Sequence, residues 1–169
     1  MWDPSTFTVQ DAVAAETLNP SNIRTWPNDL SAFRNASGKI FAFHGGQDNQ
    51  ITGFNTERFY KHLSTGMQAS SAELDEFFRF FRISGMFHCN SGPGAWVIGQ
   101  GGGASAVGVL FEGANNVLAA VVDWVEYGIA PETIEGTKFV DDNVAMGPAF
   151  QRRHCRSDSY ILRGIIEAC

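Results

Sequence analysis

The order of the apolar segments constrains the fold of this chain most strongly. Residues 39–43 and 78–83 are short, apolar runs rich in aromatic residues, and both are predicted to be strands. Between them, residues 55–63 carry apolar side chains at helical spacing, with Asn55 as the expected N-cap and Gly66 as the stop. Strands that alternate with helices form parallel sheets with crossover helices, so we predict an α/β fold.

The same signals predict three further elements: a helix over residues 11–18 that begins at Asp11, an amphipathic helix over residues 115–127, and a short edge strand over residues 137–140. The segment 71–76 is too polar to assign. No internal repeat is present. With 169 residues, the chain is long enough for one domain with its own core.

A chemically versatile residue follows each predicted strand at the same interval. Asp48 lies five positions after Phe43, and His88 lies five positions after Ile83. Because the carboxyl ends of parallel strands meet at one edge of a sheet, we expect these two side chains to lie close together. A carboxylate can orient an imidazole and stabilise its charged form, and an imidazole, with an unperturbed pKa of ~6.5, suits a general base. Acid before base is also the order that α/β-hydrolases use.

Simpler interpretations exist for each residue taken alone. Asp48 could be an ordinary turn residue after two glycines, His88 a loop histidine bonded to backbone, and Cys89 a small buried hydrophobe. The pairing of acid and base in this order favours catalysis. The other histidines are assigned no chemistry: His44 is expected to pack the acid loop, His62 to be solvated, and His154 to lack an acid partner and a preceding strand.

No serine of this chain fits the role of nucleophile. The elbow G-x-S-x-G must connect a strand to a helix, whereas Ser105 lacks both the closing glycine and a predicted strand before it. Ser91 follows the histidine, which is the wrong order. The glycines at 99–103 lack the Lys of a phosphate-binding loop and predict a flexible surface loop. We therefore expect the chain to be the C-terminal part of a larger esterase that supplies only the acid and the base.

The composition of the chain excludes some classes of binding partner. The net charge of −6 argues against nucleic acid, and no apolar run is long enough to span a membrane. The N-terminal residues do not resemble a signal peptide, and a glycosylation sequon begins at Asn35. The three cysteines have no metal-ligand spacing, and their odd number points to a partner outside the chain if the protein is secreted. The compartment and the oligomeric state stay open at this point.

A long co-linear series of segments resembles the fungal tannase/feruloyl esterase family over residues 1–156. The matching segments are residues 18–30, His44-Gly45 with Asp48, residues 54–60, 85–89, 91–94, 116–126, 128–131 and 151–155. Such a series is far more specific than either short motif. The resemblance implies an α/β-hydrolase with a large inserted lid and a Ser-Asp-His triad, in which Asp48 and His88 match the acid and the base.

The resemblance also implies the disulfide pairing, the cellular location, the metal content and the substrates of the protein. The family's cysteine before the nucleophile is bonded to the one after the catalytic histidine, which is Cys89 here, so its partner would lie outside this chain. Cys155 would pair downstream, for which Cys169 is the candidate. The family is secreted, usually glycosylated, and carries calcium in its lid, so no cofactor is expected in this chain. Its substrates are hydroxycinnamoyl or galloyl esters, which implies a plant phenolic ester as substrate.

The predicted organisation follows from this resemblance. Residues 1–38 would be the end of the lid and the return to the catalytic domain, residues 39–156 the C-terminal half of the α/β-hydrolase domain, and residues 157–169 a divergent tail. Residues 26–33 are expected to line the acyl pocket. The predicted function is a serine carboxylic ester hydrolase, with the isolated chain inactive or nearly so. The alternatives are a non-catalytic truncated product, or a weak carbohydrate-binding module that uses Trp2, Trp26, Trp96 and Trp124.

Overall fold

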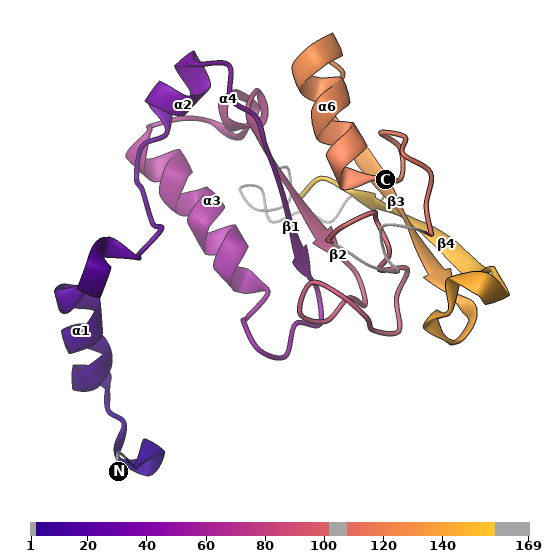
Figure 1. The fold of residues 1–169 in the computed structure, drawn as a ribbon. Helices are drawn as coiled ribbons and strands as arrows, with labels where there is room; N and C mark the ends of the chain where they lie inside the picture. The colour runs from indigo at the N-terminus through magenta and orange to yellow at the C-terminus, as the bar shows by residue number, and fades with distance from the viewer. Residues whose placement is uncertain (1–2, 102–107, 158–169) are drawn as a thin grey trace.

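The computed structural model describes residues 3–101 and 108–157 of the chain. Figure 1 shows a small central sheet with helices beside it and a hairpin at one end. The helices are α1 (Val9–Leu18), α2 (Ser31–Asn35), α3 (Phe54–Gly66), α4 (Ser71–Asp75) and α6 (Val117–Tyr127); the strands are β1 (Ile40–Gly45), β2 (Phe78–Ile83), β3 (Thr133–Phe139) and β4 (Pro148–Cys155). None of these helices is long and apolar enough to cross a membrane.

The predicted parallel pair of strands is confirmed. β1 and β2 pair in parallel, in a register that runs from Ile40 opposite Phe78 to Gly45 opposite Ile83. The chain between them passes through α3 and α4, so the unit is a crossover of the βαβ type (Figure 1). Within the described part of the chain, no strand pairs with the outer edge of β1.

Apolar side chains lie on both faces of the parallel pair. Phe41 and Phe43 pack against one cluster, and Ile40 and Ala42 pack against the other, as expected for a strand with a two-residue period. The first cluster consists of Phe81, Ile83, Met86, Trp96, Val97, Ile98, Ile134 and Phe139; the second consists of Tyr60, Leu63, Leu74, Phe77, Phe78 and Phe80. Burial on both faces explains why these strands read as continuous apolar runs in the sequence.

Two helix starts differ from the prediction. α1 begins at Val9 rather than at Asp11, because Thr8 is its N-cap and Asp11 closes the capping box from the third helical position. α3 begins at Phe54, with Gly53 rather than Asn55 as its N-cap. α1 has no buried residue and extends away from the sheet in Figure 1, so it adds nothing to the core.

Helix α4 lies in the segment that the sequence pattern does not assign, although its sequence carries a start signal. The Ser70 backbone N–H donates to the Glu73 carboxylate, and the Glu73 N–H donates to the Ser70 hydroxyl, which together form a capping box. Leu74 and Asp75 are buried at its end. A helix of five mostly polar residues shows too little helical periodicity to be assigned from the sequence.

The last two strands form an antiparallel hairpin that the sequence did not reveal. The predicted strand over residues 137–140 overlaps only the end of β3, which begins at Thr133 and ends at Phe139. Its partner β4 was not predicted. β4 begins with Pro148 and shows an exposed run before the buried His154, which masks the period of a strand. Bridges between Phe81 and Arg156 and between Val97 and Thr137 connect the hairpin to the rest of the fold.

A charged network also joins the hairpin end of the molecule to the parallel pair. Arg79 on β2 donates to the Glu132 carboxylate at 2.6 Å and to the backbone oxygens of Pro131 and Asp75 at 2.9 and 3.2 Å. Its guanidinium lies 5.4 Å from the ring centre of Trp124 on α6. Arg156 donates to Glu132 and to the buried carboxylate of Asp75.

We expect Arg79→Met to lower the free energy of unfolding by about 2 kcal/mol, because two backbone carbonyls lose their donor. Urea unfolding followed by circular dichroism measures this. Arg82→Met on the same strand is the matched control, since that side chain is 40% exposed, and its expected cost is about 0.5 kcal/mol. Equal losses in the two variants would show that the Arg79 network contributes little.

Candidate active site

The turn after β1 holds the carboxylate of Asp48 in a fixed orientation. Its Oδ1 accepts from the backbone N–H groups of Gln50 and Ile51 at 2.8 and 2.9 Å. Its Oδ2 lies 2.9 Å from His88 Nδ1 and 3.2 Å from His44 Nε2. The side chain is only 1% exposed. A turn aspartate that merely caps its own backbone would not need the two imidazoles as well.

The charged form of Asp48 is favoured despite this environment. Burial alone would raise the pKa of the carboxyl, but the hydrogen bonds from Ile51 and Gln50, and then the hydrogen bond and charge of His88, outweigh it. The net result is a pKa well below the ordinary value of an aspartate. Asp48 is therefore a carboxylate, and only an acceptor, at neutral pH.

His88 lies on a tight loop between β2 and the buried segment that begins at Ala95. Its ring is 39% exposed, and Nδ1 faces Asp48, so Nε2 is the nitrogen available to exchange a proton with a nucleophile. The loop is closed by hydrogen bonds from Phe87 N–H to the Ser91 oxygen and from Gly94 N–H to the Gly85 oxygen. The predicted proximity of Asp48 and His88 at one edge of the parallel pair is thus confirmed.

The acid and base loops touch through their main chains. A Cβ atom at Gly45 would lie 1.9 Å from the Phe87 oxygen, so only glycine fits at the end of β1. The Gln47 N–H donates to the Met86 oxygen at 3.0 Å. Gly85, at φ +73°, makes the turn into the base loop in a conformation that side chains disfavour. The dyad distance is therefore set by backbone contacts rather than by intervening side chains.

Gln100 supports the base loop and was missed in the sequence. Its amide Nε2 donates to the backbone oxygens of Trp96 and Cys89 at 2.8 and 3.2 Å, and its Oε1 accepts from the Ile98 N–H at 2.8 Å. The residue is buried, so the prediction of a flexible surface loop over 99–103 is wrong at Gln100. A glutamine among glycines gives no sequence signal of this role, because the role depends on backbone groups that approach the side chain only in the folded loop. Ser105 lies outside the described residues.

Cys89, next to the base, is exposed and free within the described chain, and it has a positive φ of 59°. Partial burial and then the negative charge of Asp48 raise the pKa of its thiol. A raised pKa disfavours the thiolate, which argues against Cys89 as a nucleophile. The interpretation as a buried hydrophobe is wrong. Cys155 ends β4, while Cys169 lies outside the described residues, so their pairing stays a prediction.

The remaining histidines have different fates. His154 lies in β4, buried, with Nε2 2.9 Å from the Ala95 oxygen; burial lowers its pKa, so it acts as a structural residue. His62 was expected to be solvated, but it is half-buried and its Nε2 is shielded from solvent, with no hydrogen-bond partner among the described residues. The expectation for His62 is therefore wrong. His44 is buried, as a packing residue would be, but it also contacts Asp48.

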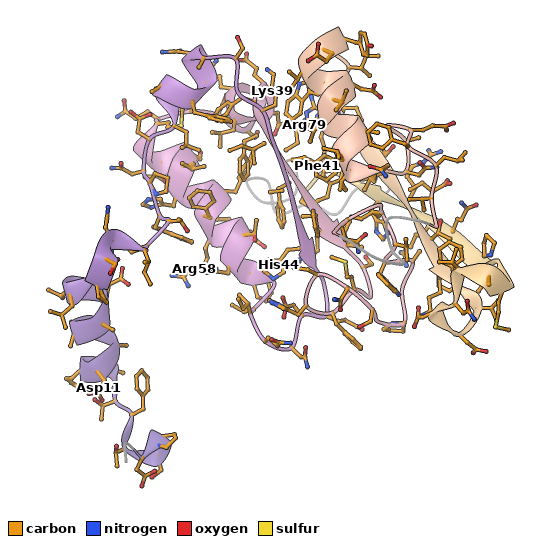
Figure 2. All side chains as sticks on the ribbon, viewed as in Figure 1. Asp11, Lys39, Phe41, His44, Arg58 and Arg79 are labelled. Atoms are coloured by element: carbon orange, nitrogen blue, oxygen red, sulfur yellow. The ribbon has the colours of Figure 1, made fainter. Side chains whose placement is uncertain are left out.

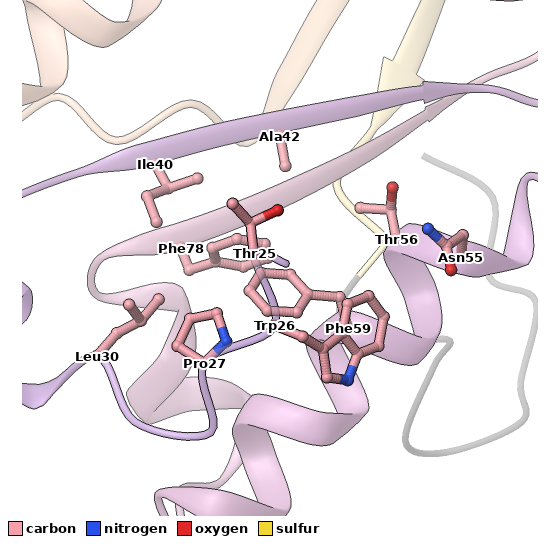
Figure 3. A pocket seen from close by; sticks show the side chains of 10 residues that line it. All are labelled: Thr25, Trp26, Pro27, Leu30, Ile40, Ala42, Asn55, Thr56, Phe59 and Phe78. Atoms are coloured by element: carbon pink, nitrogen blue, oxygen red, sulfur yellow. The ribbon is translucent and has the colours of Figure 1, made fainter. Parts of the chain in front are cut away.

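Part of the predicted acyl pocket lines a hollow of about 470 Å³ beside β1 and α3 (Figure 3). Trp26, Pro27 and Leu30 line it, and the ring centres of Trp26 and Phe59 lie 5.1 Å apart. The other residues that line the hollow are Thr25, Ile40, Ala42, Asn55, Thr56 and Phe78. Phe33, the last residue of the predicted segment, does not line it. The occupation of this hollow by an acyl group stays a prediction.

The described residues contain no group of three or more His, Cys, Asp or Glu side chains placed to hold a metal ion. The calcium that the resemblance implies was expected in a lid outside this chain, and its site stays a prediction.

Comparisons with known proteins show which family and which relatives this chain is similar to. Residues 4–157 match the family model described as tannase and feruloyl esterase. A probable feruloyl esterase B-2 from Aspergillus flavus is 59% identical over 168 residues, which are 99% of this chain and 32% of that protein. A probable feruloyl esterase B-1 from Aspergillus terreus is 49% identical over 92% of this chain and 28% of its own length. The chain thus spans about a third of the curated relatives it matches. The A. flavus match reaches into the tail over residues 157–169.

Solved structures of two relatives have the same fold as this chain, and the chain again matches about a third of their length. Feruloyl esterase B from Aspergillus oryzae superposes with a TM-score of 0.83 at 41% identity, covering 92% of this chain and 30% of that enzyme. An esterase from the same organism gives 0.81 at 44% identity, with the same coverage. The chain therefore has the fold of part of a larger α/β enzyme, as the sequence predicted.

Proposed function

Because the chain belongs to the tannase and feruloyl esterase family, we propose that Asp48 and His88 are the acid and base of a carboxylic ester hydrolase. The nucleophilic serine would lie on a segment outside the chain. The observation that carries this proposal is the 2.9 Å contact between His88 Nδ1 and Asp48 Oδ2, in a ring that is 39% exposed and whose Nε2 is the nitrogen not engaged by the carboxylate.

The proposed mechanism uses each atom of this arrangement. His88 Nε2 takes the proton of the serine as it attacks the ester carbonyl, and then gives the proton to the leaving alcohol. Water attacks the acyl-enzyme in the second half, again with His88 as the base. Asp48 holds the Nδ1–H tautomer and stabilises the imidazolium that forms in each half. Backbone N–H groups that stabilise the oxyanion would come from outside the chain.

The proposed substrates are hydroxycinnamoyl or galloyl esters from plants, as the names of the relatives suggest. We propose that Cys89 pairs with a cysteine beside the nucleophile, since its exposure next to His88 leaves it accessible to a segment outside the chain. Secretion is proposed as well, and Asn35 of the glycosylation sequon is exposed at the end of α2, where a glycan would fit. Calcium would be held outside the chain.

The carbohydrate-binding alternative finds little support. Trp96 and Trp124 are 8% and 4% exposed and belong to the interior, so neither can stack on a sugar. Trp26 lines the hollow beside α3, and Trp2 lies outside the described residues. The described tryptophans therefore form no exposed platform of the kind that polysaccharide binding requires.

A chimaera tests the proposed function directly. The region of the A. flavus relative that matches this chain would be replaced by the 169 residues of the chain, and hydrolysis of methyl ferulate and of methyl gallate would be measured. We expect the chimaera to turn over at least one ester and the isolated chain to turn over neither. Turnover by the isolated chain that survives His88→Ala would contradict the proposal. A folded but inactive chimaera would favour the non-catalytic alternative.

A further inference from the structure

The carboxylate of Asp48 has a second imidazole neighbour that the catalytic roles above do not use. His44 lies near the carboxyl end of β1, where Figure 2 labels it, and is 8% exposed. Its Nε2 is 3.2 Å from Asp48 Oδ2 and 3.2 Å from the backbone oxygen of Ile51. Both neighbours are acceptors, so Nε2 must carry a proton.

The other nitrogen of His44 completes the assignment. Nδ1 lies 2.7 Å from Thr56 Oγ1, on the first turn of α3. In a neutral ring whose proton is on Nε2, Nδ1 is an acceptor, so the Thr56 hydroxyl donates to it. The Thr56 hydroxyl thus donates to His44 Nδ1, and the Nε2–H of His44 donates to the Ile51 oxygen. The same Nε2–H lies 3.2 Å from Asp48 Oδ2, the carboxylate oxygen that accepts from His88.

We propose that His44 is a positioning residue that fixes the orientation of the Asp48 carboxylate toward His88, and that Thr56 fixes the tautomer of His44. This inference rests on the proposed roles of Asp48 and His88. The backbone of the acid turn holds only Oδ1, and the last torsion of an aspartate is broad. Oδ2 faces His44 and His88, and His88 is the ring whose charge changes during turnover.

The positively polarised N–H of His44, 3.2 Å from Oδ2, takes no part in the proton transfer and keeps Oδ2 in place while His88 cycles between its two forms. A residue that only fills space would show no preference for one tautomer, because packing depends on shape. The contact with Thr56 argues for more than packing, since it assigns opposite roles to the two ring nitrogens. The consequence is a measurable tautomer for each ring.

The test reads these tautomers in the 169-residue chain, labelled with ¹⁵N-histidine, from long-range ¹H–¹⁵N spectra at a pH at which the rings are neutral. Wild type is expected to show the Nε2–H form at His44 and the Nδ1–H form at His88. Assignment of the four histidines follows from single substitutions. The assay needs no turnover, so an inactive chimaera that keeps these tautomers would reject ester hydrolysis and leave the positioning role intact.

Paired variants separate the hydrogen bonds from the packing. His44→Asn keeps an acceptor near Thr56 but loses the N–H group beside Asp48 Oδ2, so the Nδ1–H fraction of His88 should fall about twofold or more. His44→Gln places an amide near the position of Nε2 and should restore that fraction. Thr56→Val removes the hydroxyl at constant shape and should mix the tautomers of His44, while Thr56→Ser should not.

Kinetics of the chimaera give an independent readout. We expect His44→Asn to lower kcat about tenfold at unchanged KM, and His44→Gln to recover most of the loss. An Nδ1–H form at His44 in wild type would overturn the proposal. So would an unchanged His88 tautomer in both His44→Asn and Thr56→Val. If His44→Asn does not fold, Thr56→Val carries the test, because it exchanges one hydroxyl for one methyl group.

Discussion

His88→Ala is expected to lower kcat for methyl ferulate in the chimaera by about a million-fold, the scale seen when the base of a serine hydrolase is removed. Without the imidazole, the proposed dyad has lost the group that takes the proton of the nucleophile. KM should change little, because His88 is expected to act mainly in the transition state rather than in ground-state binding. Initial rates over a range of ester concentrations measure both constants.

His62→Ala is the control for this variant, since it removes the same type of side chain from α3 without touching the dyad. It should stay within a few-fold of the parent kcat. Unfolding curves of both variants establish that the fold is intact. A His88→Ala chimaera with more than a hundredth of the parent kcat would remove His88 from the role of base.

Asp48→Asn is expected to lower kcat by about ten thousand-fold through the wrong tautomer. The two backbone N–H groups require an oxygen at the Oδ1 position, so the amide nitrogen must take the position of Oδ2. There it donates toward His88 Nδ1, which must then become an acceptor. The proton of His88 moves to Nε2, and the ring can no longer accept from the serine. The exposed Asp141→Asn is the control and should leave kcat unchanged.

The same variant has a pH signature in stability. Because the pKa of Asp48 is depressed in the folded state, its carboxylate contributes stability above the unfolded value of ~3.9, and this contribution is lost as the pH falls through the folded-state pKa. The difference in unfolding free energy between wild type and Asp48→Asn should therefore be present at neutral pH and shrink in acid. A difference that grows in acid would contradict the assignment. Urea unfolding at several pH values measures it.

Local sequence patterns were sufficient where the structure depends on local chemistry. Residues 78–83 form β2 with the predicted bounds, and the helix predicted over residues 115–127 is α6, Val117–Tyr127, because aromatic β-propensity and helix capping act over a few residues. Asp48 and His88 could be paired because the geometry of a parallel crossover fixes which ends of the strands meet.

Other features depend on contacts that no short pattern records. β4 pairs with β3 across a turn, and its polar, exposed face hides the alternation of a strand. Gln100 is defined by three backbone partners on a folded loop, and His44 by a carboxylate and a hydroxyl from two different elements. A histidine four residues before an aspartate is the one local signal of their contact, and this spacing alone does not specify that the two side chains meet.

The main-chain contact between the acid and base loops has a consequence for mutational tolerance. Since Gly45 lies against the Phe87 oxygen with no side chain between them, substitutions in the surrounding core cannot easily change the distance between Asp48 and His88. Drift in the apolar clusters would erode stability long before it disturbed the dyad. A single codon change at Gly45 would do the reverse, by separating the two loops in a protein whose core is otherwise untouched.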